Sequence, residues 1–161
     1  MTRLVRRVVA TALLATAFGT TLATATPAGA ATSTVTTRED QVSTLINQQR
    51  ASHNCGPLTT DTKLRTVARA HSADMVARNY FSHTSPDGVT FAVRIRSTGY
   101  TLAYAENIAW GYRSAADVVD GWMNSPGHRR NILNCAYNRA GLGVAYGSDG
   151  SPYYTQDFAR A

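Results

Sequence analysis

Three short segments, far apart in the 161-residue chain, carry side chains that can do chemistry. His83 lies among aromatic, hydroxyl and turn residues, Glu106 lies between small and apolar residues, and His128 follows Pro126-Gly127. Imidazoles and carboxylates bind divalent metals and exchange protons with bound water. If folding brings the three segments together, they form a polar cleft. The sequence therefore predicts a candidate ligand cleft of His83, Glu106 and His128, with Ser125 beside it.

The two histidines are the predicted metal ligands, and a divalent ion such as zinc suits them. In that interpretation His83, Glu106 and His128 are catalytic, with Glu106 activating water in a metal-assisted hydrolase that acts on extracellular peptide or cell-wall substrates. The residues lack the His-Glu-x-x-His spacing that aligns a hydrolytic zinc on one helix. The alternative is a buried hydrogen-bond network in which the rings tie loops to the fold. The sequence leaves open whether the protein is an enzyme, and it favours a protein that is not.

The remaining histidines and the aromatic residues have simpler interpretations. His71 lies on the apolar face of an expected helix and is predicted to be a core residue, whereas His53 is expected to be solvated. Trp122 continues a helical apolar face, which favours core packing. Trp110 and Tyr112 either pack in the core or line a groove for a sugar, lipid or peptide.

Residues 1–30 have the features of a secretory signal peptide. Three arginines precede an uncharged stretch from Val8 to Leu22, and Ala28-Gly29-Ala30 supplies the small-x-small pattern before a cleavage site. The uncharged stretch is short and rich in Ala and Thr, so an uncleaved membrane anchor is the less favoured alternative. We therefore expect a secreted, extracellular protein with no transmembrane segment after cleavage.

The charge of the rest of the chain argues against nucleic-acid binding. The sequence has 16 basic and 10 acidic side chains, and 3 of the basic ones lie within the expected signal peptide, which leaves +3. These charges are scattered, whereas nucleic-acid binding needs a dense basic surface. About 130 residues remain, which is enough for one domain with its own core. We expect a monomer that attracts anionic wall or membrane-surface polymers weakly.

The chain contains two cysteines, Cys55 and Cys135. In an exported protein, a disulfide between them is the expected state. Two free thiols are the alternative. A metal site is disfavoured because neither cysteine belongs to a Cys-x-x-Cys or Cys-His pair.

Helical periodicity dominates the first part of the chain and strand patterns dominate the last part. Residues 31–36 are expected to be a disordered lead-in, and Thr37 with Asp40 resembles a capping box that starts the first helix. Further helices are expected from near Thr60 or Asp61 to near Asn79-Tyr80, from about Thr90 to Ser97, from Ser114 to Met123 and in a short turn after Ser125. Strands are expected from Tyr104 to Tyr112, from Gly141 to Tyr146 and from Tyr153 to Phe158, the last two joined by a turn that contains Asp149-Gly150. This order predicts an α+β fold with helices packed on an antiparallel sheet.

The segments, in this order, resemble the CAP superfamily (cysteine-rich secretory, antigen 5 and pathogenesis-related proteins), and in particular its bacterial SCP-like extracellular members. The resemblance covers nearly all of the expected domain, residues 37–161, and implies a three-layer α-β-α sandwich with a central antiparallel sheet. The motifs that carry it are Asn47 and Arg50, Ala70-His71-Ser72 with Met75, Phe81-Ser82-His83, Glu106-Asn107-Ile108-Ala109, Ser125-Pro126-Gly127-His128-Arg129 with Asn131-Ile132-Leu133, Gly141-Leu142-Gly143, and Thr155-Gln156 with Phe158.

Many members of that superfamily carry two histidines and two acidic residues in one cavity. His83, Glu106 and His128 match three of these positions, and the second acidic position falls at Ser125. The resemblance with an incomplete tetrad implies an extracellular binding or interaction module. Its expected partner is a small lipidic, peptide or cell-wall-derived ligand.

Overall fold

The computed structural model describes residues 28–102 and 104–161, with side chains from residue 33 onward. The predicted signal peptide lies almost entirely outside these residues and stays a prediction. The description below concerns the part of the chain from α1 to the C-terminus.

A four-stranded sheet forms the centre of the fold, in the order β1-β3-β4-β2. β3 (Arg139–Tyr146) and β4 (Pro152–Ala159) form the expected hairpin, and β2 (Tyr104–Trp110) pairs antiparallel with β4. β1 (Thr59–Thr60) pairs parallel with β3, so the sheet is mixed, and the prediction of a purely antiparallel sheet was wrong. Two exposed residues are too short a segment to show an alternating pattern, which is why this strand was missed.

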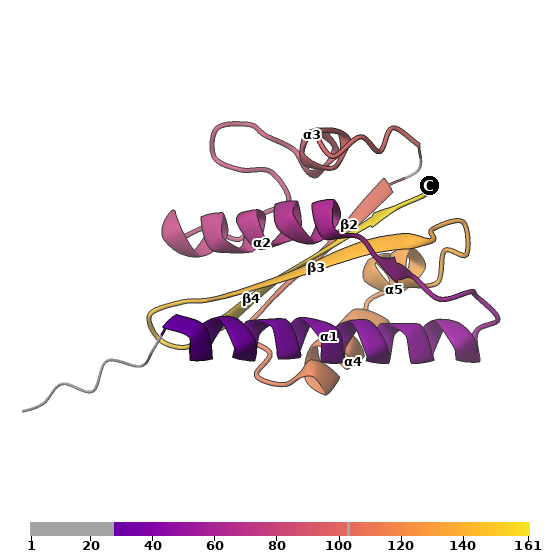
Figure 1. Ribbon diagram of the computed structural model, residues 1–161, viewed down its shortest axis with the longest axis horizontal. Helices are drawn as coiled ribbons and strands as arrows, with labels where there is room; N and C mark the ends of the chain where they lie inside the picture. The colour runs from indigo at the N-terminus through magenta and orange to yellow at the C-terminus, as the bar shows by residue number, and fades with distance from the viewer. Residues whose placement is uncertain (1–27, 103) are drawn as a thin grey trace, which may run out of the picture.

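Helices cover both sides of this sheet (Figure 1). α2 (Thr62–Ala77) and α3 (Phe91–Arg96) lie on one side. α1 (Ala28–Ser52) and α4 (Ala115–Met123) lie on the other, and α5 (Pro126–Ile132) packs next to α4. This arrangement agrees with three layers and places α2 and α3 over the face of the sheet that carries the candidate site.

The first helix begins before Thr37, so the expected disordered lead-in and the expected cap were both wrong. Residues 31–36 belong to α1, and the Thr37 hydroxyl donates to the Ser33 carbonyl, one turn earlier in the same helix, at 2.9 Å. Val35 packs against the hydrophobic core. The tertiary contact of this segment outweighs its small, polar composition, which taken alone suggested disorder.

The other helices begin close to the predicted positions, and side chains cap three of them. In α2, α3 and α4 the N-cap side chain accepts a hydrogen bond from the amide three residues later, which satisfies an otherwise unpaired donor. These pairs are Asp61 with Leu64, Thr90 with Val93, and Ser114 with Asp117. Ser125 is the N-cap of α5 and Pro126 opens the helix, as expected, but the Ser125 hydroxyl makes no capping hydrogen bond.

α2 packs closely against the sheet because β3 presents glycines to it. A methyl group built on Gly141 would collide with the backbone of Leu64 and Arg65, and one on Gly143 would collide with Ala68 and Arg69. The two glycines are two residues apart, so they lie on the same face of β3. Their missing side chains let the helix backbone approach the strand directly.

Cys55 and Cys135 form the predicted disulfide, which joins the loop after α1 to the loop after α5. Beside it, the buried guanidinium of Arg50 donates to four backbone carbonyls, those of Gly56, Ile132, Asn134 and Tyr137, at 2.6–3.0 Å. A covalent bond and a cluster of charge-assisted hydrogen bonds therefore hold the same two loops together.

Candidate functional site

The structure brings His83 and Glu106 together. His83 Nδ1 lies 2.8 Å from Glu106 Oε1, and Arg94 Nη2 lies 2.7 Å from Oε2 of the same carboxylate. The Glu106 side chain is fully buried, whereas 46% of the His83 side chain is exposed. An imidazole nitrogen next to a carboxylate carries the proton, so in the neutral ring Nε2 is left as an acceptor. This Nε2 has no partner among the described residues.

Several elements of the α2 side hold this arrangement. Glu106 lies within β2, where the backbone is fixed by pairing with β4. The loop that carries His83 is tied to α2 by a hydrogen bond of 2.9 Å between His71 Nε2 and the Ser82 carbonyl. Arg94 Nη2 also donates to the His83 carbonyl at 3.0 Å, and Nη1 donates to the Val89 carbonyl at 3.0 Å. Arg94 thus fixes both the carboxylate and the loop of the histidine.

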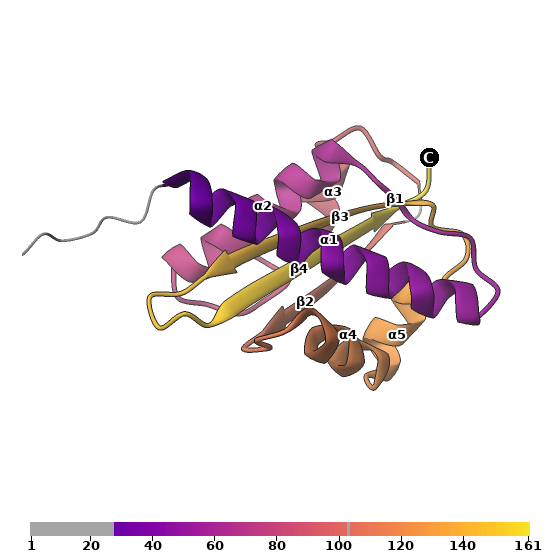
Figure 2. The same ribbon diagram turned by 60° about the horizontal axis from the view of Figure 1, so that its bottom comes forward.

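His128 lies beside this pair, although no described hydrogen bond joins its ring to it. α5 is anchored to β2 because Asn107 Nδ2 donates to the His128 carbonyl at 3.3 Å, and Asn131 Nδ2 donates to Asn107 Oδ1 at 2.9 Å. Figure 2 shows α4 and α5 beside β2. Burial, and to a smaller extent the charge of nearby His83, lower the pKa of His128.

A cavity of about 300 Å³ adjoins His128, and aromatic rings form much of its wall. Ser125 lines it, as do Phe81, Trp110 and Tyr112, which are 48%, 52% and 39% exposed. The Tyr153 ring lies between those of Phe81 and Trp110, at centroid distances of 6.5 and 5.8 Å. We call the exposed rings of Phe81, Trp110 and Tyr112 the aromatic wall. Trp110 and Tyr112 are thus exposed at a cavity and are not core residues, and a ligand groove at this place stays a prediction.

The other aromatic and histidine predictions are confirmed. Trp122 is a core residue, 1% exposed, whose indole donates to the Ile108 carbonyl at 3.2 Å. His71 is 1% exposed, and its burial lowers the pKa of the ring. His53 is exposed and bonds only to neighbouring side chains and to the Gln49 carbonyl.

The metal interpretation receives no support from this geometry. Within residues 33–102 and 104–161, no three His, Cys, Asp or Glu side chains are placed to hold one ion together. Both oxygens of Glu106 are occupied, one by His83 and the other by Arg94. Zinc ligation by His83 and His128 stays a prediction.

Two residues of the site were missed by sequence reasoning, Arg94 and Asp157. Asp157 stands opposite Glu106 in the register of β2 and β4 and is fully buried. The available signal was that Asp157 is the only charged residue of the strand from Pro152 to Ala159. The sequence does not distinguish Arg94 from nearby Arg96, which is exposed, so the role of Arg94 could not be predicted.

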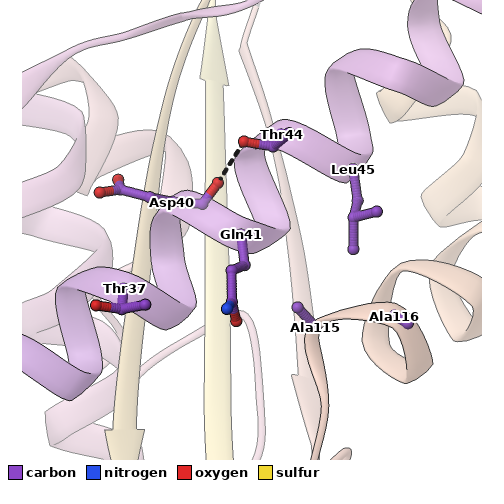
Figure 3. Close-up of a pocket in the computed structure, with 7 residues that line it drawn as sticks. All are labelled: Thr37, Asp40, Gln41, Thr44, Leu45, Ala115 and Ala116. Atoms are coloured by element: carbon purple, nitrogen blue, oxygen red, sulfur yellow. Dashed lines mark hydrogen bonds between the residues drawn. The ribbon is translucent and has the colours of Figure 1, made fainter.

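A second hollow, lined by α1 and α4, lies on the opposite face of the sheet (Figure 3). It has a volume of about 650 Å³. Its lining consists of four polar side chains of α1, together with Leu45 and two alanines of α4. The Thr44 hydroxyl on its wall is bonded to the Asp40 carbonyl of its own helix at 2.9 Å. No histidine lines this groove, and it takes no part in the candidate site.

Comparison with known proteins identifies the family. The sequence profile of the cysteine-rich secretory protein family, CAP, matches residues 44–158. The chain belongs to this family. Two Bacillus subtilis CAP relatives are the uncharacterized protein YkwD, 41% identical over 129 residues, and the uncharacterized membrane protein YlbC, 38% identical over 126 residues.

The fold agrees with solved CAP structures. An extracellular protein with an SCP domain from Bacillus anthracis superposes with a TM-score of 0.75 at 33% identity, covering 85% of this chain and 45% of that one. The matches cover 80% of this chain but 49% of YkwD, and 78% of this chain but 35% of YlbC. The chain therefore spans half or less of each of these relatives. Among the described residues, no helix combines the length and the apolar character that crossing a membrane requires.

Proposed function

We propose that this CAP domain is a secreted binding module whose cleft, formed by His83, Glu106 and His128 with the adjoining cavity, holds a saccharide unit of a cell-wall polymer. The observation that carries this proposal is that the two ring nitrogens of His83 differ in their partners. Its Nδ1 is committed to a buried carboxylate, and its unpartnered Nε2 lies on a half-exposed ring. The free Nε2 of such a ring accepts a hydrogen bond from a ligand hydroxyl.

The aromatic wall accounts for the ligand class. Ligand pockets in proteins are mostly apolar, with a few polar groups that fix orientation. Here Phe81, Trp110 and Tyr112 offer flat apolar surface, while Ser125 and His128 supply polar atoms at the same cavity. A sugar ring combines an apolar face with hydroxyl donors at its edge. Secretion agrees with the extracellular SCP-domain protein that the chain resembles.

Nuclear magnetic resonance titration of the labelled protein tests the ligand class. Three probes are added separately: a soluble glycan fragment of peptidoglycan, its stem peptide, and a fatty acid. We expect only the glycan to shift the Trp110 indole resonance. Trp110→Ala and His83→Ala should each weaken its binding about tenfold, or about 1.4 kcal/mol. Tyr146→Ala is the matched control, because this exposed aromatic residue does not line the cavity. Binding of the peptide or fatty acid alone, or unchanged glycan affinity in Trp110→Ala, would overturn the proposal.

Zinc titration distinguishes the binding module from the hydrolase. We expect calorimetry of the metal-stripped protein to give the same weak or absent heat as the His83→Ala, His128→Ala double variant. One-to-one binding at micromolar affinity or better that disappears in the double variant would restore the metal interpretation. In that case, a hydrolytic activity lost in Glu106→Gln would identify Glu106 as the base.

A further inference from the structure

The buried side chain of Asp157 lies against the candidate site on the strand next to Glu106. The two residues are directly paired across β2 and β4, and Asp157 is also paired with Gly141 of β3. Directly opposed residues of neighbouring strands point to the same face of a sheet. Because a side chain at Gly141 would point into α2, Glu106 and Asp157 both lie beneath the helices of the α2 side.

The Asp157 carboxyl group has no hydrogen-bond donor beside it among the described residues. Its residue exposure is 0%, and neither carboxyl oxygen receives a hydrogen bond from a donor group among the described residues. Buried carboxylates are normally paired with a cation or with several N–H groups, because the unpaired charge loses its hydration. The residue directly opposite Asp157 on the neighbouring strand is Glu106, so the two carboxyl groups lie side by side on one face of the sheet. Two ionised carboxylates repel each other, so a hydrogen bond between them requires a proton.

The positive charge near Glu106 and Asp157 is enough to balance one ionised carboxylate. Arg94 of α3 supplies one permanent positive charge, and its Nη2 is already 2.7 Å from Glu106. From α2, buried His71 lies within electrostatic range of Glu106, and its pKa is lowered, so it is neutral at neutral pH. From the loop, His83 faces Glu106 Oε1. β3 contributes only Gly141 at the paired position.

We propose that Glu106 and Asp157 form a buried carboxyl pair that holds a single proton, with Asp157 as the neutral donor and Glu106 as the ionised acceptor. Asp157 is then a positioning residue. It fixes the Glu106 carboxylate while Oε1 faces His83 and Oε2 faces Arg94. The second acid of the site comes from β4, whereas the sequence pattern placed that position at Ser125.

The electrostatic environment agrees with this assignment. Burial, followed by the negative charge of Glu106, raises the pKa of Asp157 well above its ordinary range, and Arg94 offsets only part of this effect. A like-charged neighbour in a dry site is the usual reason that one member of a carboxyl pair stays protonated. The inference does not depend on the ligand of the cleft and holds whether or not a saccharide binds there.

Carboxyl carbon chemical shifts followed against pH test the pair directly in the wild-type protein. We expect one protonated carboxyl signal to persist at pH 7, to be absent from Asp157→Asn, and to remain in Asp120→Asn, which removes an exposed aspartate of α4. In Glu106→Gln, Arg94 is free to face Asp157, so Asp157 should titrate at a lower pH than in the wild type. Two ionised carboxyls at pH 7, or a protonated signal that survives in Asp157→Asn, would overturn the proposal.

The pH dependence of stability gives a second readout that a purely structural role would not move. A raised pKa in the folded state makes Asp157 stabilising below its unfolded pKa, and this contribution is lost as the pH rises toward the folded pKa. Asparagine keeps the shape without the ionisation. The melting temperature of Asp157→Asn relative to wild type should therefore rise between pH 4 and pH 7, by about 3 °C or more. A constant difference across this range contradicts the proposal. If Asp157→Asn does not fold, the wild-type titration alone decides.

Discussion

Arg94 Nη2 contacts both Oε2 of Glu106 and the carbonyl of His83, so one guanidinium nitrogen joins the buried carboxylate to the loop that carries the histidine. The arginine side chain is 10% exposed and the carboxylate is fully buried. Arg94 therefore helps to hold the loop of His83 in place. His83, Glu106 and Arg94 lie outside the lining of the cavity beside His128.

Replacing Arg94 with methionine should destabilise the protein strongly. The change leaves Glu106 ionised and buried without its cation, and breaking a buried pair from one side costs about 3–5 kcal/mol. Urea denaturation measures the loss. Arg96→Met is the matched control, because Arg96 is exposed and among the described residues contacts the hydroxyl and the ring of Tyr104 and no carboxylate, so its loss should be below about 1 kcal/mol. Equal effects of the two changes would show that the pair with Glu106 contributes little.

Alanine at Gly141 tests the direct approach of α2 to β3. The added methyl group collides with backbone atoms of Leu64 and Arg65, which no rotamer change relieves, so we expect a loss of about 2–3 kcal/mol or failure to fold. Gly127→Ala adds the same methyl group in α5, where nothing lies within 4 Å, and should be neutral or slightly stabilising. Thermal unfolding followed by circular dichroism compares the two. A wild-type midpoint for Gly141→Ala would contradict the close packing.

Loss of the disulfide should lower the unfolding midpoint. The bond joins cysteines 80 residues apart, and the chain-entropy model gives such a closure up to about 4–5 kcal/mol. Cys55→Ser and the double variant Cys55→Ser, Cys135→Ser should lose similar amounts, because either change removes the same bond. Differential scanning calorimetry of oxidised and reduced wild type provides the reference. An unchanged midpoint on reduction would show that the bond adds nothing to stability.

Acidification should destabilise the protein through His71. Burial lowers the pKa of this ring, so its contribution to stability is complete above the unfolded pKa of about 6.5 and is lost as the pH falls toward the folded pKa. The deficit of His71→Gln relative to wild type should thus be smaller at pH 5 than at pH 7, by on the order of 1 kcal/mol. The exposed His53→Gln change provides the control and should show no such difference. Urea midpoints at the two pH values measure both variants, and a pH-independent deficit in His71→Gln would argue against titration of this ring.

The sequence was sufficient where a local pattern determines the structure. α2 and α4 follow their apolar spacing and their caps, and the β3–β4 hairpin follows from Asp149-Gly150 between two strand-forming runs. The contact between His83 and Glu106 was expected from the segments that carry them, and the structure places them 2.8 Å apart.

The rest depended on neighbours that only the folded chain brings together. The early start of α1 is supported by packing of Val35 against the core, which local composition cannot reveal. β1 is defined by its partner strand alone. Arg94 reaches Glu106 because of where α3 packs, and Asp157 lies opposite Glu106 because of the register of β2 with β4. The spacing of residues along the sequence predicts neither the packing nor the register.

The four carbonyls that accept hydrogen bonds from Arg50 have a consequence for the reduced protein. The same guanidinium that bonds the turn after α1 also bonds the segment between α5 and β3, and the disulfide joins these two segments as well. Reduction of the disulfide therefore leaves the hydrogen bonds of Arg50 to hold the two segments together.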